Sequence, residues 1–126
     1  MDKQSPAEAA LLFQSPFQWE VYTICREALS ALDPSIIEVY SLTEVSYAAK
    51  RCFLWLVPIS RQHCLVNFDL PLEISDPLFR QQKIQHAGRY IHQMDVRMME
   101  TLTQAISQDF LKLALSTGRE GVHGKA

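Results

Sequence analysis

The sequence predicts an α+β fold with two N-terminal helices, an antiparallel meander sheet of about five strands, and a long C-terminal helix packed on one sheet face. Three observations support this prediction. The first 32 residues carry two helix-start signals, residues 36–94 are rich in β-branched and aromatic side chains, and residues 97–117 have apolar side chains at three- and four-residue intervals. Connections between the predicted strands are short, which favours antiparallel pairing.

The two N-terminal helices are predicted from repeated capping signals. Ser5-Pro6-Ala7-Glu8 combines an N-cap residue, a proline in the first turn and a glutamate three residues after the cap, and it starts a helix through about Phe13. Ser15-Pro16-Phe17-Gln18 repeats this arrangement. We expect the second helix to end at Asp33-Pro34, because proline disfavours a helical conformation in the preceding residue.

The strands are predicted from the composition of the middle of the chain. Four short segments have strand composition: residues 36–40, 44–49, 52–59 and 63–69. The run from Cys52 to Val57 is apolar at successive positions, as in a central strand with both faces covered. Residues 83–85 and 89–94 form a further extended segment, and Gly88 predicts a bulge within it.

One helix from about Arg97 to Thr117 closes the predicted fold, with Gly118 as its C-cap. No interdomain linker is evident, so residues 1–126 are interpreted as a single domain. Residues 1–4 and the polar, glycine-rich residues 119–126 are expected to be disordered tails.

Composition narrows the classes of function. The formal net charge of -2 argues against a strongly basic nucleic-acid binder. Between Lys50 and Arg97, however, the sequence contains seven basic residues and only four acidic ones. This excess could favour a small anionic ligand on the sheet, although solvated surface charge alone explains such an imbalance more often. No apolar stretch reaches the 18 residues of a membrane span, and no secretory signal is recognised, so a soluble cytoplasmic protein is expected.

The candidate ligand-binding residues are aromatic and basic. We expect Tyr47, Trp55, Tyr90 and His92 to line the wall of a pocket in which Arg51 or Arg89 binds an anion. In an extended strand, Tyr90 and His92 point to one face and Arg89 and Ile91 to the other. The alternative is structural: the aromatic residues fill the edges of the core, His92 is held by hydrogen bonds and the arginines are solvated.

Motifs for catalysis and cofactors are lacking in the sequence. Glycines are too few before residue 118 for a phosphate-binding loop or a dinucleotide fingerprint, so no cofactor is predicted. The histidines and cysteines have no recognised zinc spacing, and no metal site is predicted. The three cysteines, Cys25, Cys52 and Cys64, lie among apolar residues and are expected to be buried free thiols. A hydrolase or transferase with His92 as acid or base stays as the alternative to a binding protein.

A family resemblance covers the chain from about Phe13 to Ala114. The motifs that carry it are the segment around Tyr47, Lys50-Arg51-Cys52-Phe53-Leu54-Trp55-Leu56-Val57-Pro58, Asn67-Phe68-Asp69-Leu70 and Gly88-Arg89-Tyr90-Ile91-His92. The chain resembles a bacterial family of unknown function that is distantly similar to the YdhG-like proteins. Related modules occur fused to nuclease or transport-associated domains, and some YdhG-like members are described as iron chaperones. The resemblance therefore implies a binding or accessory role.

The predicted function is that of a small, non-enzymatic binding or accessory protein. Its ligand would be a small anion or a partner protein on the sheet. A homodimer is also predicted, since helices on one side would leave an apolar sheet face uncovered. Neither nucleic acid nor membrane is expected as a partner.

Overall fold

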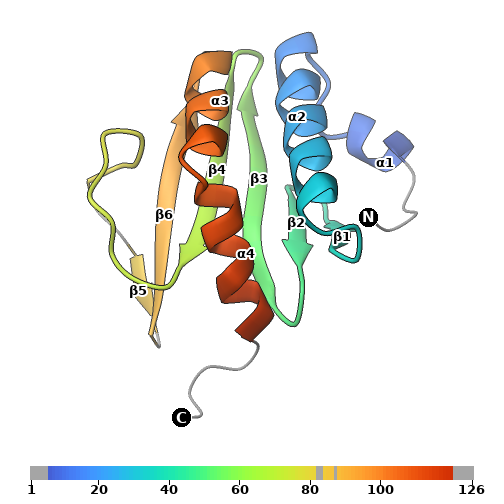
Figure 1. The fold of residues 1–126 in the computed structure, drawn as a ribbon. Helices are drawn as coiled ribbons and strands as arrows, with labels where there is room; N and C mark the ends of the chain where they lie inside the picture. Colours follow the sequence, from blue (N-terminus) through green and yellow to red (C-terminus); the bar gives the residue numbers. More distant parts are fainter. Residues whose placement is uncertain (1–5, 82–83, 87, 121–126) are drawn as a thin grey trace.

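The computed structural model describes residues 6–81, 84–86 and 88–120. Along the chain the elements are α1 (Pro6–Ala10), α2 (Pro16–Leu32), β1 (Ile37–Tyr40), β2 (Val45–Ala48), β3 (Cys52–Ser60), β4 (His63–Leu70), β5 (Ile84–His86), β6 (Arg89–Val96), α3 (Met99–Ser107) and α4 (Phe110–Glu120). The six strands form one antiparallel sheet in the order β1-β2-β3-β4-β6-β5 (Figure 1). The predicted α+β fold with a meander sheet is confirmed.

Helix α2 begins as the sequence predicts. The Ser15 hydroxyl accepts the N–H of Gln18 at 3.0 Å, and the Gln18 side chain accepts the N–H of Ser15 at 3.1 Å. This capping box satisfies backbone donors that the first turn would otherwise leave free. The helix ends at Leu32, and the extended Asp33 follows it. The equivalent Ser5 cap of α1 lies outside the described residues.

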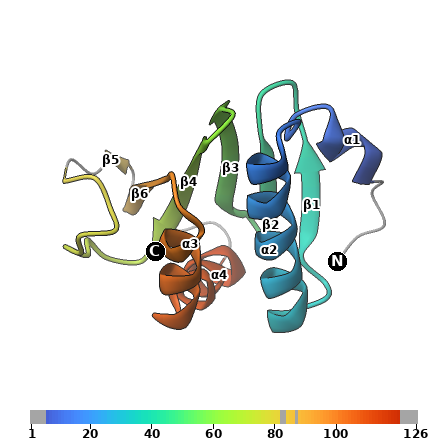
Figure 2. The ribbon, with the colours of Figure 1, turned by 90° about the horizontal axis from the view of Figure 1, so that it is seen from above.

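Helices α2, α3 and α4 cover the same face of the sheet, as Figure 2 shows from above. The core lies between these two layers. Its main members are Val21, Cys25 and Leu29 of α2, Val45, Leu54, Leu56, Val66, Phe68 and Met94 of the sheet, and Leu102, Ala105, Leu111, Ala114 and Leu115 of α3 and α4. None of the helices that the structure describes is long and apolar enough to cross a membrane.

Two details of the predicted elements are wrong. The C-terminal helix is divided into α3 and α4, because Asp109 adopts a left-handed conformation with φ of 65°. A short polar side chain tolerates this conformation better than most, and the chain can change direction there. The sheet has six strands, in line with the predicted number of about five, but Gly88, with φ of 77°, forms the turn of a β5–β6 hairpin instead of the predicted bulge.

Gly118 lies inside α4 rather than at its C-cap, so this prediction is also wrong. Its carbonyl accepts the N–H groups of Lys50 and Arg51 at 3.0 and 3.1 Å, which ties the end of α4 to the β2–β3 turn. A Cβ atom at position 118 would lie 2.5 Å from Cδ1 of Phe53. Residues 119 and 120 are helical, contrary to the predicted tail, and residues 1–4 and 121–126 lie outside the described part.

We expect Gly118→Ala to destabilise the protein although alanine is the better helix former. The added methyl group must displace the buried Phe53 ring, and such overpacking typically costs about 1–3 kcal/mol, against a helix-propensity gain of about 1 kcal/mol. Urea unfolding measures the difference. Ser116→Ala, at an exposed position of the same helix, is the control and should change stability by less than about 0.5 kcal/mol. Equal stabilities of Gly118→Ala and the unmodified protein would contradict the packing argument.

Candidate functional site

The sheet face turned away from the helices is called the open face. Cross-strand register places three rows of side chains on it, because directly opposed residues of antiparallel strands share a face. The central row is Val39, Ser46, Trp55, Asn67 and Gln93; one flanking row is Val57, Leu65 and Asp95; the other is Asp69, Ile91 and Ile84. Charged side chains thus lie toward the two ends of the open face and neutral ones lie across its middle.

Arg51, Trp55, Asp69 and Arg89 form the Asp69 cluster at one end of the open face. Nε of Arg89 lies 2.6 Å from Oδ2 of Asp69, and Nη2 of Arg51 lies 3.6 Å from the same oxygen. Arg89 also donates from Nη2 to the carbonyl of Cys52 at 3.1 Å, and its guanidinium carbon lies 5.9 Å from the ring centroid of Trp55. The indole and the carbonyl together fix the orientation of this guanidinium.

The Asp69 cluster has unused hydrogen-bonding capacity. Oδ1 of Asp69 and Nε of Arg51 are buried and have no hydrogen-bond partner among the described residues. Two guanidinium groups share one carboxylate, which leaves one positive charge in excess. The side chains of Arg51 and Arg89 are 15% and 27% exposed, whereas that of Asp69 is fully buried. Solvent and ligands therefore reach the cations of the cluster before they reach its carboxylate.

The structure brings together three of the six predicted site residues, namely Arg51, Trp55 and Arg89. His92 is opposite Phe68 on the helix-covered face and is fully buried. Its Nε2 accepts the N–H of Ile74 at 2.9 Å, and its Nδ1 lies 2.8 Å from the carbonyl of Tyr90. These two contacts define a neutral imidazole with the proton on Nδ1. Tyr90 is opposite Leu70 and is half-buried.

Tyr47 belongs to a second polar group, the Glu38 cluster, between α2 and the sheet. The Tyr47 hydroxyl donates to Oε2 of Glu38 at 2.8 Å. Oε1 of Glu38 accepts from Tyr40 at 2.5 Å, from Tyr22 at 3.2 Å and from Nε of Arg26 at 3.2 Å. The Glu38 side chain is fully buried. Its carboxylate is saturated with donors, so this cluster stabilises the α2–sheet contact and has little capacity for a ligand.

Burial raises the pKa of each tyrosine in the Glu38 cluster. For Tyr40 and Tyr47 burial is the largest cause, and the neighbouring Glu38 carboxylate raises their pKa further. The pKa of Tyr22 is raised in the same way, although its hydrogen bond with Tyr40 opposes the increase. All three phenols therefore stay protonated in the folded protein at pH values where an unfolded chain begins to lose these protons.

We expect the stability of the protein to fall above about pH 10. The protonated phenols are favoured in the folded state, so their contribution is complete below the unfolded pKa and is lost as the pH rises beyond it. For each phenol that is protonated in the folded state and ionised in the unfolded state, the free energy of unfolding falls by about 1.4 kcal/mol per pH unit in this range. Urea unfolding between about pH 9 and about pH 11 measures the slope, which Tyr47→Phe should reduce. A constant free energy of unfolding across this range would contradict the assignment.

A further ion pair lies at the opposite end of the open face. Arg80 binds both carboxylate oxygens of Asp95 at 2.8 Å, and Nε2 of His63 lies 2.8 Å from Oδ1 of the same residue. The hydrogen bonds from Arg80, with a smaller contribution from His63, lower the pKa of Asp95 to about 2. Asp95 is therefore ionised and paired at neutral pH.

The three cysteines are free, as the sequence predicts, but they differ in accessibility. Cys25 and Cys64 are buried and Cys52 is half-buried. Burial raises the pKa of both Cys25 and Cys64 to about 12. The two buried thiols thus form little of the reactive thiolate at neutral pH.

We expect a water-soluble thiol reagent to modify Cys52 first in the folded protein, because the other two thiols are buried and protonated. Mass spectrometry after brief labelling identifies the modified residue. Urea should make all three cysteines reactive, and Cys52→Ser should remove the fast phase. Rapid modification of Cys25 or Cys64 in the native state would show that their packing is looser than described.

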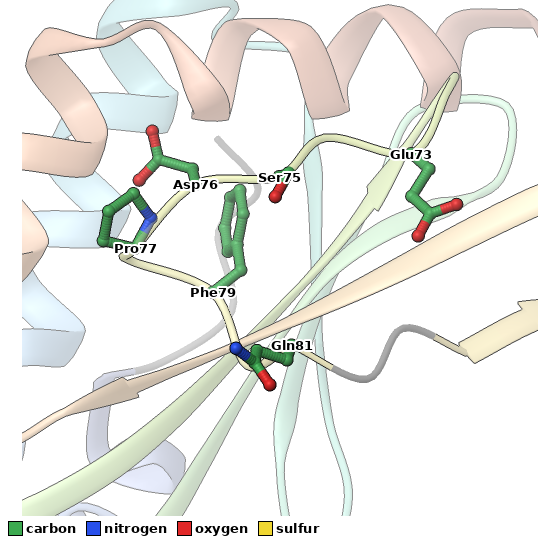
Figure 3. Close-up of a pocket in the computed structure, with 6 residues that line it drawn as sticks. All are labelled: Glu73, Ser75, Asp76, Pro77, Phe79 and Gln81. Atoms are coloured by element: carbon green, nitrogen blue, oxygen red, sulfur yellow. The ribbon is translucent and has the colours of Figure 1, made fainter.

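A hollow of about 650 Å³ lies in the loop between β4 and β5, lined by Glu73, Ser75, Asp76, Pro77, Phe79 and Gln81 (Figure 3). The Phe79 ring lies between the two carboxylates in this view. Both charged side chains of the lining are acidic, so this hollow does not suit an anion. Within the described ranges, no three His, Cys, Asp or Glu side chains gather as metal ligands would.

Asp69 and Glu38 organise the two polar clusters, and neither is among the predicted site residues. A signal for Asp69 exists in Asn67-Phe68-Asp69-Leu70, because alternation places the apolar pair on one face and the polar pair on the other. For Glu38 the sequence pattern is misleading, because it suggests an exposed side chain. It lies between Ile37 and Val39, yet these apolar neighbours are exposed and Glu38 is buried. Only the tertiary contact with α2 explains this inversion.

No curated protein and no solved structure matches the chain. A family model described as Domain of unknown function (DUF5655) matches residues 8–115, which is most of the sequence and includes both polar clusters. The chain therefore belongs to the DUF5655 family of unknown function.

Proposed function

We propose that this chain is a non-enzymatic binding protein that takes an anionic group at Arg51 and Arg89 on the open face of its sheet. One observation carries the proposal: two arginines converge on a single carboxylate oxygen, and the less tightly bound of them, Arg51, lies 3.6 Å from that oxygen and is partly exposed. A phosphate or carboxylate would balance the excess charge and accept from a guanidinium group.

The contacts of Arg89 prepare it for such a role. Asp69, the Cys52 carbonyl and the Trp55 ring hold its guanidinium in place, so little side-chain freedom is lost when an anion arrives. Arg51 completes the pair, since its Nη2 is 3.6 Å from Asp69, longer than a good hydrogen bond. We infer that Arg51 can turn toward an anion while Arg89 remains on Asp69.

The environment of His92 supports a binding role rather than acid–base catalysis. A general base needs a lone pair within reach of a substrate proton. In His92 the Nε2 lone pair accepts from Ile74, and the ring is fully buried against Phe79 at a centroid distance of 5.0 Å. An accessory role is also what the resemblance to the YdhG-like proteins implies.

Binding of inorganic phosphate tests the proposal. We expect up to about 10 mM phosphate, at constant ionic strength, to produce saturable chemical-shift changes in the amide signals of residues 51–55 and 89–91. Arg51→Gln should abolish saturation, because it removes one of the two guanidinium groups of the site. Arg61→Gln is the matched control: it removes the same charge from an exposed position at the β3–β4 turn and should leave binding intact.

The variants also separate ligand binding from a loss of folding. Arg51→Lys keeps the positive charge next to Asp69 but lacks the planar guanidinium with its paired donors, and it should bind phosphate more weakly than the unmodified protein. Identical titrations for the unmodified protein and Arg51→Gln, with both folded, would refute the proposal. A complete lack of saturable shifts in the unmodified protein would do the same.

A further inference from the structure

We propose that two copies of this chain pack face to face through their open faces, with the central row of each copy lying over that of the other along a two-fold axis. The open face is unusually apolar for a solvated surface. Ile37, Val39 and Ile84 are exposed on the outer strands, and half-buried Trp55, Val57, Leu65 and Ile91 lie between them. Apolar side chains gathered on an uncovered sheet face mark an interaction surface more often than a freely solvated one.

The chemistry of the central row suits a second copy of itself. Its members, Val39, Ser46, Trp55, Asn67 and Gln93, are all uncharged. The amides of Asn67 and Gln93 contain donors and acceptors together, so a row that meets its own copy can exchange hydrogen bonds.

The charges on the open face do not oppose this contact. Asp69 is paired with Arg51 and Arg89, and Asp95 is paired with Arg80. A second copy that covers the open face therefore does not bury either carboxylate without a cationic partner. These two clusters lie at opposite ends of the strands. A two-fold axis through the central row, perpendicular to the strands, keeps the excess positive charges of the two copies at opposite ends of the interface.

The size of the open face predicts a weak dimer. Three strands of eight or nine residues and three of three or four residues give a flat footprint of roughly 550 Å², from a strand spacing of about 4.8 Å and a rise of about 3.3 Å per residue. A standard interface buries about 800 Å² on each partner. We therefore expect a monomer–dimer equilibrium with a dissociation constant in the micromolar range rather than a permanent dimer.

Sedimentation velocity from about 5 µM to about 500 µM, in buffer without phosphate, tests the dimer. The unmodified protein should shift from monomer to dimer over this range. Val39→Lys places a charge on an open-face side chain that is 43% exposed, and Gln93→Glu places like charges near the two-fold axis. Each should raise the dissociation constant at least about tenfold.

Leu32→Lys is the matched control, because Leu32 is 39% exposed at the end of α2 in the helix layer. It should dimerise like the unmodified protein. A monomer at every concentration would overturn the inference, and so would a dimer that survives both open-face substitutions. The dimer does not rest on anion binding: Arg51→Gln should still dimerise, so failure of either proposal can be recognised separately.

Discussion

The placement of three helices on one side of the sheet is the constraint on which the other features of this structure depend. Because α2, α3 and α4 share one face, every inward position of the long strands is apolar or hydrogen-bonded, and the other face is left to interact with its surroundings. The aromatic contacts of Phe68, Phe79 and Phe110, with centroid distances of 4.9 to 6.5 Å, fill the space where the β4–β5 loop meets the helix layer. These contacts fill the core, and the open face is the surface on which we propose that binding takes place.

The two buried carboxylates, Glu38 and Asp69, lie on opposite faces of the sheet and differ in how fully their oxygens are hydrogen-bonded. Glu38, beneath α2, is surrounded by three phenols and one guanidinium and has both oxygens bonded. Asp69, on the open face, uses one oxygen for two guanidinium groups and has a buried second oxygen without a described partner. A saturated group strengthens a fold, whereas an unsaturated one retains the capacity to interact. This contrast is why the Asp69 cluster, and not the larger Glu38 cluster, supports the binding proposal.

The sequence predicted those features that local chemistry determines. The Ser15 cap, the end of α2 before Pro34 and the four strands from residue 36 to residue 70 follow from capping, proline geometry and strand composition, and all were found within one or two residues. The break at Asp109 was missed because apolar spacing continues through it, and only the backbone reveals the left-handed residue. Gly118 was misassigned because a glycine near a helix end resembles a C-cap, and its contact with Phe53 is tertiary. For the same reason, alternation separated Arg89 from His92 correctly but could not reveal the partner that joins Arg51 to Arg89.

The hydrogen bonds between the Gly118 carbonyl and the amides of Lys50 and Arg51 affect how folding can proceed while the chain is being synthesised. Strands β1 to β4 leave the ribosome well before α3 and α4, and their apolar inner face has no complete cover until those helices emerge. The contacts that close the layer join residues almost seventy positions apart, about half of the chain. Non-local closure of this kind slows folding and prolongs the exposure of strands to aggregation. The chain can consequently complete its fold only after α4 has been synthesised and has reached Lys50 and Arg51.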